Sequence, residues 1–423
     1  MILLRCDRSR SRVGSQVFFA LALGVLAGCS GSEDAVPLLQ VTEEDGVTVV
    51  TNSPDIPTGH PVFTFEPVLR LREDPSDPES LLVQPSFQFE IGENGRYYVP
   101  DRRQGHIAVY DGEGVFLERI GRSGDGPGEF RSLTLQRISG DTISVFDFHN
   151  QRTTLLDLEG ELIEVMRPAG TGLVIGYDYG PGGTLLVKRV QADSDDDVDY
   201  IAMSMTILSA ETDTVGHIST ASVAASMLSR VEVSPGSFST LSMDIPYGGY
   251  PQVVHVPERG ILASDGDSPD LVWYDHRARK RMIIRTGLSS HPITAAVRAG
   301  YEERVRQRRL ERARERGTTP QPVPDYPYPE VSGFFSWVTV DDAGWIWLED
   351  VWRGNEEPGK PTTTFHVVDP EGRYWGTVEM PQSRFSFARG RLHCLVEDPD
   401  TGARVPTVFR VVPAVEGVSY PQQ

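Results

Sequence analysis

Cysteine is scarce in this sequence. The 423 residues include three cysteines, Cys6, Cys29 and Cys394. The first two lie near the N-terminus, in a segment interpreted below as a signal peptide and anchor, so Cys394 has no partner and we expect no disulfide in the fold. Cys394 lies in the alternating run "RLHCLVE", which predicts a buried, inert thiol on a strand rather than a nucleophile.

Positive charge is scarce as well. The chain has 40 basic residues against 60 acidic ones, a formal net charge of −20. A surface this acidic repels a phosphate backbone, and we therefore expect no nucleic-acid partner. Lysine is almost absent, so arginine supplies nearly all of the positive charge; the lysines are Lys188, Lys280 and Lys360.

Long apolar runs are missing except for "VFFALALGVLA" at 17–27. This run is too short to span a membrane comfortably, and arginines precede it, as in a bacterial signal peptide. The overlapping stretch "LAGCS" at 26–30 is typical of a lipobox, in which the cysteine is lipidated and becomes the first mature residue. An ordinary signal peptide with a chance cysteine is the alternative.

We therefore expect a signal peptide over 1–28, lipidation of Cys29 and a flexible tether over 29–44. Ser30 follows the cysteine where an aspartate would otherwise be read as a sorting signal, and this is typical of outer-membrane lipoproteins. The expectation is an exported monomer, anchored by lipid to the outer membrane on its periplasmic or surface face.

The sequence has neither an HExxH motif nor a GxSxG motif, the signatures of a zinc protease and of a hydrolase nucleophile elbow. What recurs instead is a strand that ends in Asp-x-x-Gly. Aspartate binds its own backbone and glycine supplies positive φ, so each tetrad predicts a hairpin. The copies are "VYDGEG" at 109–114, "LLDLEG" at 155–160, "VVDPEG" at 367–372 and the degenerate "WYDHRA" at 273–278.

The spacing of these hairpins predicts a β-propeller. Asp111 and Asp157 are 46 residues apart, which fits one blade of four strands. We expect six blades, within a range of five to seven, over 45–412, with a C-terminal tail at 413–423. The expected blades are 85–121, 131–167, 172–220, 250–287, 333–380 and 383–412.

The last expected blade shows only three strands. Its outer strand can come from "VFTFEPVLRLR" at 62–72, which would close the ring and leave no large sheet edge.

A glycine-rich stretch, "IGRSGDGPGEF" at 120–130, invites comparison with a phosphate-binding loop. Such a loop precedes a helix, whose N-terminus faces the anion. Here a strand is expected to follow, and Asp125 and Glu129 would repel phosphate. The surrounding pattern at 116–138 also parallels 68–89, so we interpret the stretch as a corner between blades.

The Asp-x-x-Gly hairpins and "GRSGDGPGEF" resemble the six-bladed β-propeller lipoproteins of bacteria, relatives of the NHL-repeat propellers. "VTVDDAGWIWLEDV" at 338–351 and "VVDPEGRYWGTVEMP" at 367–381 resemble the late blades of that group. The resemblance covers about 45–412. It implies the fold, but little about function, because most members of the group are uncharacterised exported proteins.

One segment, 289–317, breaks the β pattern and predicts an inserted helix within 290–317. Ser289 or Ser290 can cap it, and Gly317 can end it. Apolar residues recur every four positions and form one stripe; they are Ile293, Val297, Tyr301 and Val305. Eight arginines against four glutamates over 298–316 make a basic element, either a solvated helix packed on the propeller or a contact to anionic lipid or an acidic partner.

Ligands of propellers usually bind at the mouth of the axial channel. Candidate residues on expected inner strands are Gln88, Gln136, Tyr177, His255 and Trp337. Their direction is open, because a register slip of one residue reverses it. Trp345 and Trp347 share one face of "WIW", which favours packing between blades over an exposed stacking surface.

Calcium is a weak cofactor prediction. Asp193, Asp195 and Asp197 have EF-hand-like spacing, but Val198 stands where the turn needs glycine and Ser204 where the loop needs glutamate. A solvated hairpin tip is the other interpretation. No other cofactor is expected.

Two functions remain, apart from that of an accessory subunit whose inserted helix contacts a membrane transporter. The first is a non-catalytic binding or scaffolding protein of the cell envelope, with an envelope protein, a peptide or a glycan as ligand. The alternative is a metal-dependent hydrolase, lactonase or lyase that uses His255 and acidic residues at the axial channel.

Overall fold

The computed structural model describes residues 39–421, apart from 55–60, 75, 168–172, 182–183, 196–197, 210–212, 223–225, 235–236, 321, 324 and 353–362. The chain divides into two units, Met1–Val36 and Pro37–Gln423, and the described residues belong to the second. The expected signal peptide and Cys29 lie outside the described residues. No helix in the described part is long and apolar enough to cross a membrane.

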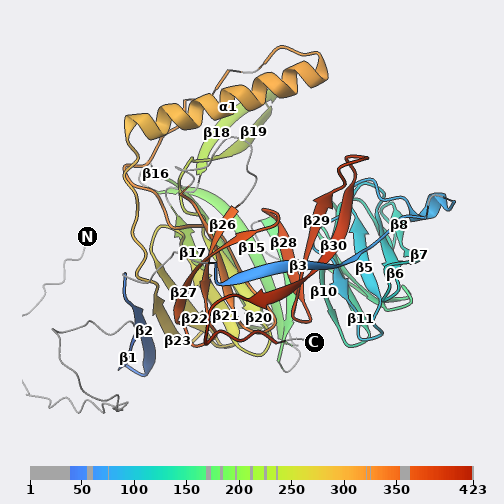
Figure 1. The fold of residues 1–423 in the computed structure, drawn as a ribbon, viewed down its shortest axis with the longest axis horizontal. Coiled ribbons are helices and arrows are strands. Elements are labelled where there is room, and N and C mark those ends of the chain that lie inside the picture. Colours follow the sequence, from blue (N-terminus) through green and yellow to red (C-terminus); the bar gives the residue numbers. More distant parts are fainter. Residues whose placement is uncertain are drawn as a thin grey trace, which may run out of the picture. The chain divides into compact units, whose positions relative to one another are not determined.

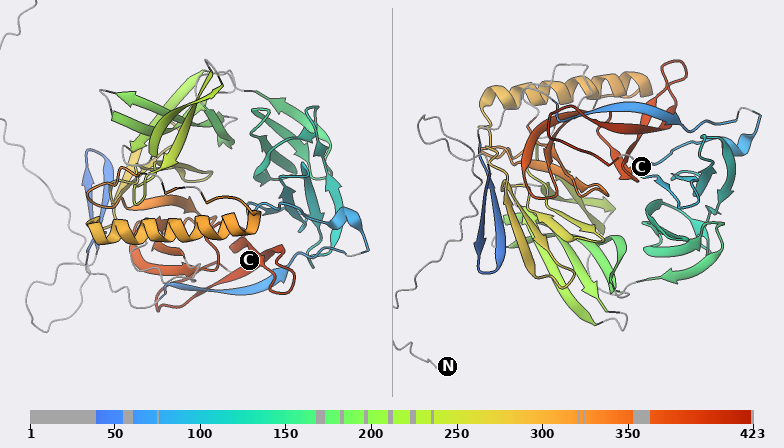
Figure 2. Two further views of the ribbon diagram at one scale, coloured as in Figure 1. Left: turned by 90° about the horizontal axis from the view of Figure 1, so that it is seen from above. Right: turned by 60° about the horizontal axis from the view of Figure 1, so that its bottom comes forward.

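Six antiparallel blades surround a common axis in the second unit (Figure 1, Figure 2). Blade one contains β4 (Glu90–Ile91), β5 (Tyr97–Asp101), β6 (His106–Tyr110) and β7 (Phe116–Ile120). Blade two contains β10 (Leu133–Ser139), β11 (Thr142–Asp147), β12 (Arg152–Asp157) and β13 (Leu162–Met166). Blade three contains β14 (Leu173–Gly180), β15 (Thr184–Asp195), β16 (Val198–Leu208) and β17 (Thr214–Ser222). In each blade the first strand lies innermost.

The remaining blades complete the ring. Blade four contains β20 (Gln252–Val256), β21 (Gly260–Ser264), β22 (Asp270–Tyr274) and β23 (Lys280–Arg285). Blade five contains β24 (Phe335–Val340), β25 (Ile346–Asp350), β26 (Thr363–Val368) and β27 (Tyr374–Met380). Blade six contains β28 (Phe385–Ala388), β29 (Arg391–Glu397), β30 (Arg404–Pro413) and β3 (Phe63–Arg70). The expected six-bladed all-β fold is thus confirmed.

Closure by an N-terminal strand is confirmed as well. β3 pairs antiparallel with β30, from Phe63 opposite Pro413 to Arg70 opposite Thr407. The inner face of β3 is apolar: Phe63 is buried and packs edge-on against Trp345 of blade five, at 5.0 Å between ring centroids. The strand therefore joins blade six to blade five while its backbone completes the sheet.

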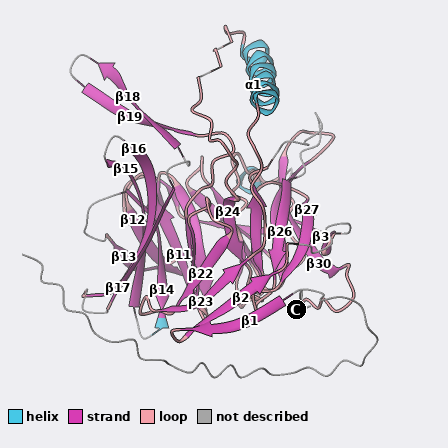
Figure 3. Ribbon diagram, turned by 90° about the vertical axis from the view of Figure 1, so that its left-hand side faces the viewer, coloured by secondary structure: helices cyan, strands magenta, loops and turns pink. Residues whose placement is uncertain are grey.

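Blade four is larger than expected. β1 (Leu39–Glu44) and β2 (Val47–Asn52) extend its outer edge, with β2 parallel to β23 (Figure 3). The flexible tether expected over 29–44 is therefore wrong for residues 39–44, which form β1. Asn52 fixes the hairpin, because its side chain donates to Gly372 O at 3.0 Å and accepts from Tyr374 N at 2.8 Å.

Aspartate closes the hairpins as expected. The Asp111 carboxylate accepts from the backbone N–H groups of Glu113 and Val115, both at 2.9 Å, and Gly114 has a φ of +82°. The same pair of bonds recurs at Asp157, Asp275, Asp341 and Asp369. One turn chemistry therefore shapes the outer hairpins of four blades and the inner hairpin of blade five.

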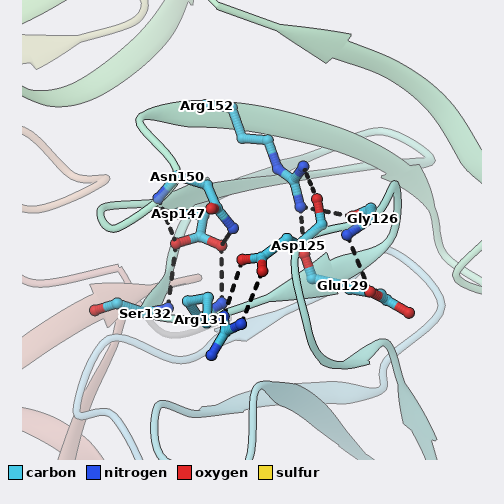
Figure 4. A network of polar contacts seen from close by, with 8 residues as sticks. All are labelled: Asp125, Gly126, Glu129, Arg131, Ser132, Asp147, Asn150 and Arg152. Atoms are coloured by element: carbon cyan, nitrogen blue, oxygen red, sulfur yellow. Dashed lines mark hydrogen bonds and ion pairs between the residues drawn. The ribbon is translucent and has the colours of Figure 1, made fainter.

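The glycine-rich stretch is the corner that the sequence predicts. Its short strands β8 (Arg122–Ser123) and β9 (Glu129–Phe130) pair with each other, and strand β10 follows, not a helix. The buried guanidinium of Arg152 donates to the carbonyls of Asp125, Gly126 and Glu129 at 2.6–2.7 Å (Figure 4). These carbonyls are satisfied from within the protein, so the corner is structural.

The core lies between the blades. Trp345 and Trp347 pack with Phe63, Phe385 and their neighbours, which confirms the inter-blade interpretation. Cys394 is buried in the same cluster, and burial raises the pKa of its thiol to about 12. The C-terminal segment after β30 returns to this cluster, where the buried Tyr420 donates to the Asp341 carboxylate at 2.8 Å.

Among the described residues, one α-helix, α1 (Ala295–Arg316), follows blade four. Thr294 caps it and Gly317, at φ +62°, ends it, so the expected cap at Ser289 or Ser290 was wrong. The chain stays extended through Pro292, which forms a β-bridge with Val331. Two members of the predicted stripe, Ile293 and Val305, are buried.

Smaller elements lie between the blades. They are η1 (Pro78–Ser80) before blade one, and the hairpin β18 (Ser226–Ser234) and β19 (Ser237–Asp244) between blades three and four, which the sequence did not predict.

Candidate functional site

The two ends of the axial channel hold two cavities. The first strands of the blades run in one direction, so their beginnings meet at one mouth and their ends at the other. The beginnings surround a cavity of about 610 Å³, which we call the helix-side cavity because Tyr301 of α1 lines it. The ends surround a second cavity of about 590 Å³, which we call the far cavity.

Two β-bulges direct charged side chains into the helix-side cavity. In blade three, the pairing of β14 with β15 shifts between Val174 and Gly176, and Gly176 stands opposite Lys188. In blade five, the pairing of β24 with β25 shifts between Phe335 and Trp337, and Trp337 stands opposite Glu349. A bulge disrupts the hydrogen-bond ladder between two strands and changes the direction in which nearby side chains point. Lys188 and Glu349, both on second strands, line the cavity as a result.

Lys188 has no hydrogen-bond or ion-pair partner among the described residues. Lys188 is half-buried and lines the cavity. Burial alone lowers the pKa of its ammonium group from its ordinary value to about 8. The amine is therefore mostly charged at neutral pH, but at a cost that a bound anion would remove.

Glu349 contrasts with Lys188, because its buried carboxylate is already bonded. It accepts from Ser336 Oγ at 2.8 Å and lies 3.3 Å from Arg384 Nη1. The same guanidinium lies over the ring of Trp337, 5.0 Å from its centroid. The two side chains that the sequence nominated at this mouth, Gln88 and Trp337, line the cavity together with Gln252.

Aromatic residues roof this cavity. Tyr301 packs edge-on against Tyr247, at 5.7 Å between ring centroids, and Tyr247 accepts a hydrogen bond from Arg304 of α1 at 3.0 Å. Tyr326 and Tyr328 contact Tyr301 from the returning segment. The inserted helix thus has a defined place: its apolar stripe covers one mouth of the channel.

The far cavity is lined by charged groups that the structure partly pairs. Its polar walls come from several blades and include Glu90, Arg137, His255, Arg259, Asp342 and Arg389. Burial raises the pKa of Glu90 to about 8, although the nearby Arg137 opposes that shift. His255 Nδ1 lies 2.6 Å from Asp178 Oδ2, and Arg137 Nη1 lies 3.5 Å from the other oxygen of that carboxylate.

The five nominated residues are not brought together. Gln88 and Trp337 line the helix-side cavity, whereas His255 lines the far cavity. Tyr177 is buried against Phe146, at 5.6 Å between ring centroids, and lines neither cavity. Gln136 lies at a bulge of β10, and its side chain is outside what the structure describes.

The calcium candidates are strand residues where the structure describes them. Asp193 and Asp195 belong to β15, paired with Tyr200 and Val198 of β16, and Asp197 is outside the described residues. The tip of the hairpin itself lies outside the described residues. In the described part of the chain, no three His, Cys, Asp or Glu side chains come together as ligands of a metal ion.

Sequence reasoning missed Lys188 and Glu349. The signal for Lys188 was present, since one of three lysines in the chain interrupts the apolar strand "TLLVKRV". An uncompensated charge within such a strand favours a special environment. Glu349 gave no such signal, because its neighbours in "WLEDV" are equally compatible with a turn.

Comparison with known proteins identifies similarity in one part of the chain. Residues 79–168, which include blades one and two, match a family described as a 6-bladed beta-propeller. No curated protein matches the chain.

Solved structures with low sequence identity are similar to most of the chain. A candidate exported protein from Bacteroides fragilis is 10% identical, with a TM-score of 0.48, and the match covers 86% of this chain and 99% of that one. A DUF4221 family member from Bacteroides vulgatus is 14% identical, with a TM-score of 0.37 and coverage of 83% and 99%. An inactive virginiamycin B lyase from Staphylococcus aureus with quinupristin is 10% identical, with a TM-score of 0.35 and coverage of 85% and 91%. At these values none of them assigns a function to this chain.

Proposed function

We propose that this propeller is an exported envelope protein that binds, without catalysis, a small ligand bearing a carboxylate in the helix-side cavity. The observation that carries the proposal is the Lys188 ammonium in the cavity wall, which has no partner among the residues that the structure describes. A buried cation without a partner costs stability, and proteins keep such groups chiefly where a ligand completes them. A carboxylate would supply the missing charge through a charge-assisted hydrogen bond.

The rest of the cavity supports a ligand of modest size with polar groups besides the carboxylate. About 610 Å³ is within the usual range of small-molecule sites. Gln88 and Gln252 offer both donors and acceptors, and the bonded Glu349 offers a fixed acceptor. The C-terminus of a short peptide and an acidic sugar both carry this chemistry, in line with the peptide or glycan ligand expected from the sequence.

The first experiment measures binding by calorimetry, using detergent-solubilised full-length chain. The probes are N-acetyl amino acids and uronic acids, each paired with its neutral amide. We expect acids to bind and amides to bind at least about tenfold more weakly, because only the acids pair with Lys188. Lys188→Met should abolish the preference, and Lys280→Met, at an exposed strand end, should keep it.

A stability measurement separates loss of binding from loss of folding. Methionine nearly fills the volume of lysine without a buried charge, so Lys188→Met should raise the free energy of unfolding by about 1–3 kcal/mol. Equal affinity for acids and amides, or an acid preference that survives in Lys188→Met, would contradict the proposal.

The proposal includes attachment of the protein to the outer membrane through lipidated Cys29, as the sequence predicts. Metabolic labelling with a fatty acid should mark the wild-type chain and not Cys29→Ala. A labelled Cys29→Ala variant would refute this part and leave the binding proposal intact.

A further inference from the structure

Two imidazoles face each other beside the far cavity. Nε2 of His255, on β20, lies 3.2 Å from Nε2 of His276, in the turn between β22 and β23. The rings stand at 77° to each other, with centroids 5.3 Å apart. The site is at the opposite end of the channel from the helix-side cavity, so the inference is independent of the proposed function.

Asp178 of blade three sets the tautomer of His255. Its carboxylate oxygen lies 2.6 Å from Nδ1, so Nδ1 carries the hydrogen and Nε2 presents its lone pair toward His276. Asp178 accepts this hydrogen bond and so orients the ring. A carboxylate in this position is the usual outer partner of a metal-bound histidine.

The separation of the two nitrogens matches metal ligation. Two Zn–N bonds of about 2.0–2.1 Å at a tetrahedral angle place their nitrogens about 3.3–3.4 Å apart. A neutral imidazole is the form that binds metal.

From this geometry we propose that His255 and His276 bind one divalent metal ion of the zinc type, oriented by Asp178. The described residues provide no third ligand, so water or a molecule in the far cavity would fill the other positions. His255 itself lines that cavity, which gives the metal a route to solvent and to a second ligand. A metal ion bound here would also provide the metal that the alternative function, a metal-dependent hydrolase, lactonase or lyase, requires.

The test titrates Zn²⁺ into full-length chain purified without a histidine tag and freed of metal. We expect one Zn²⁺ per chain by calorimetry, and a visible absorption band when Co²⁺ replaces it. His276→Ala should weaken binding at least about tenfold, and Asp178→Asn by about 10–100-fold without removing a ligand. His149→Ala, at an exposed turn histidine elsewhere, is the matched control and should bind like wild type.

His276 lies in a partly exposed turn, so we expect the His276→Ala variant to fold. It therefore tests the site even if a variant that removes the buried His255 does not fold. A hydrogen bond between the two rings, without metal, is the competing explanation of the 3.2 Å contact. It predicts no stoichiometric uptake of Zn²⁺ or Co²⁺, or uptake unchanged in His276→Ala. Either result would overturn the proposal.

Discussion

The two mouths of the channel differ in whether their buried charged side chains have partners within the protein. At the far mouth, Asp178 is engaged by both Arg137 and His255 within the protein. At the helix-side mouth, Lys188 has no such partner among the described residues, although Glu349 lines the same cavity. The difference teaches that charge at the far mouth is largely paired within the protein, whereas under the proposed function a ligand would supply the charge that pairs with Lys188.

The pH dependence of acid binding is the strongest way to test this contrast. The pKa of Lys188 is lowered to about 8 by burial, so its ammonium form, which binds the anion, is lost as pH rises through that value. From pH 7 to pH 9.5, affinity for a carboxylate should fall by up to about 30-fold, as calorimetry would show.

Binding in the far cavity would depend on a different group. Arg137, Arg259 and Arg389 line that cavity and stay charged throughout this range, whereas Glu90, whose pKa burial raises to about 8, gains negative charge as pH rises. A fall in acid affinity that persists in Lys188→Met would therefore place the anion at the far mouth, and an affinity that is constant to pH 9.5 would show that Lys188 does not hold the carboxylate.

Removing an aromatic side chain that covers the helix-side cavity should lower acid affinity by less than the pH change does, and should leave the far mouth unaffected. Tyr301→Ala deletes the ring that closes the helix-side cavity and contacts Tyr247. Acid affinity should fall about three- to tenfold, mainly through faster dissociation in stopped-flow measurements. Phe148→Ala, at an exposed aromatic residue, is the control. A drop in Zn²⁺ affinity in Tyr301→Ala would show that the mouths are coupled, which the contrast does not allow.

Arg384→Gln should have the smallest effect. Its side chain is 56% exposed, so its ion pair with Glu349 is screened by water and contributes at most about 1 kcal/mol. We expect acid affinity to fall by less than about fivefold in calorimetry, compared with Arg410→Gln on blade six as control. A loss as large as that of Lys188→Met would show that Arg384, rather than Lys188, holds the carboxylate.

The fold was predictable because its signals are local and repeated. Turns like the one at Asp111 recur at the outer hairpins of four blades, and alternating apolar runs identify the strands between them. The closing strand was also predictable, since 62–72 is a strand without a local partner. The prediction of a flexible tether was wrong at residues 39–44 because β1 forms only by pairing with β2. The strand β2 is in turn held by hydrogen bonds between Asn52 and the distant Gly372 and Tyr374.

The candidate site was less predictable, since it depends on bulges and on contacts between blades. Sequence alternation assigns a face to Lys188 only if its register with β14 is known, and the bulge at Ile175 changes that register. The same limit explains Tyr177, which was nominated for the channel and is buried between blades. His276 was overlooked because it stands in a degenerate hairpin turn, where its partner His255 is far away along the chain.

Blade six has a consequence for how the chain folds. Its sheet pairs β3 with β30. Because β3 comes early in the chain and β30 comes last, β3 can pair only after almost the whole propeller has been synthesised. During synthesis, the apolar face of β3, with Phe63, has no partner until nearly the whole chain has emerged. Contacts so distant in sequence form slowly, and unpaired strands invite aggregation in the interval. We therefore expect ring closure to be the late, slow phase of refolding, and protection of β3 to be the step that a chaperone could assist.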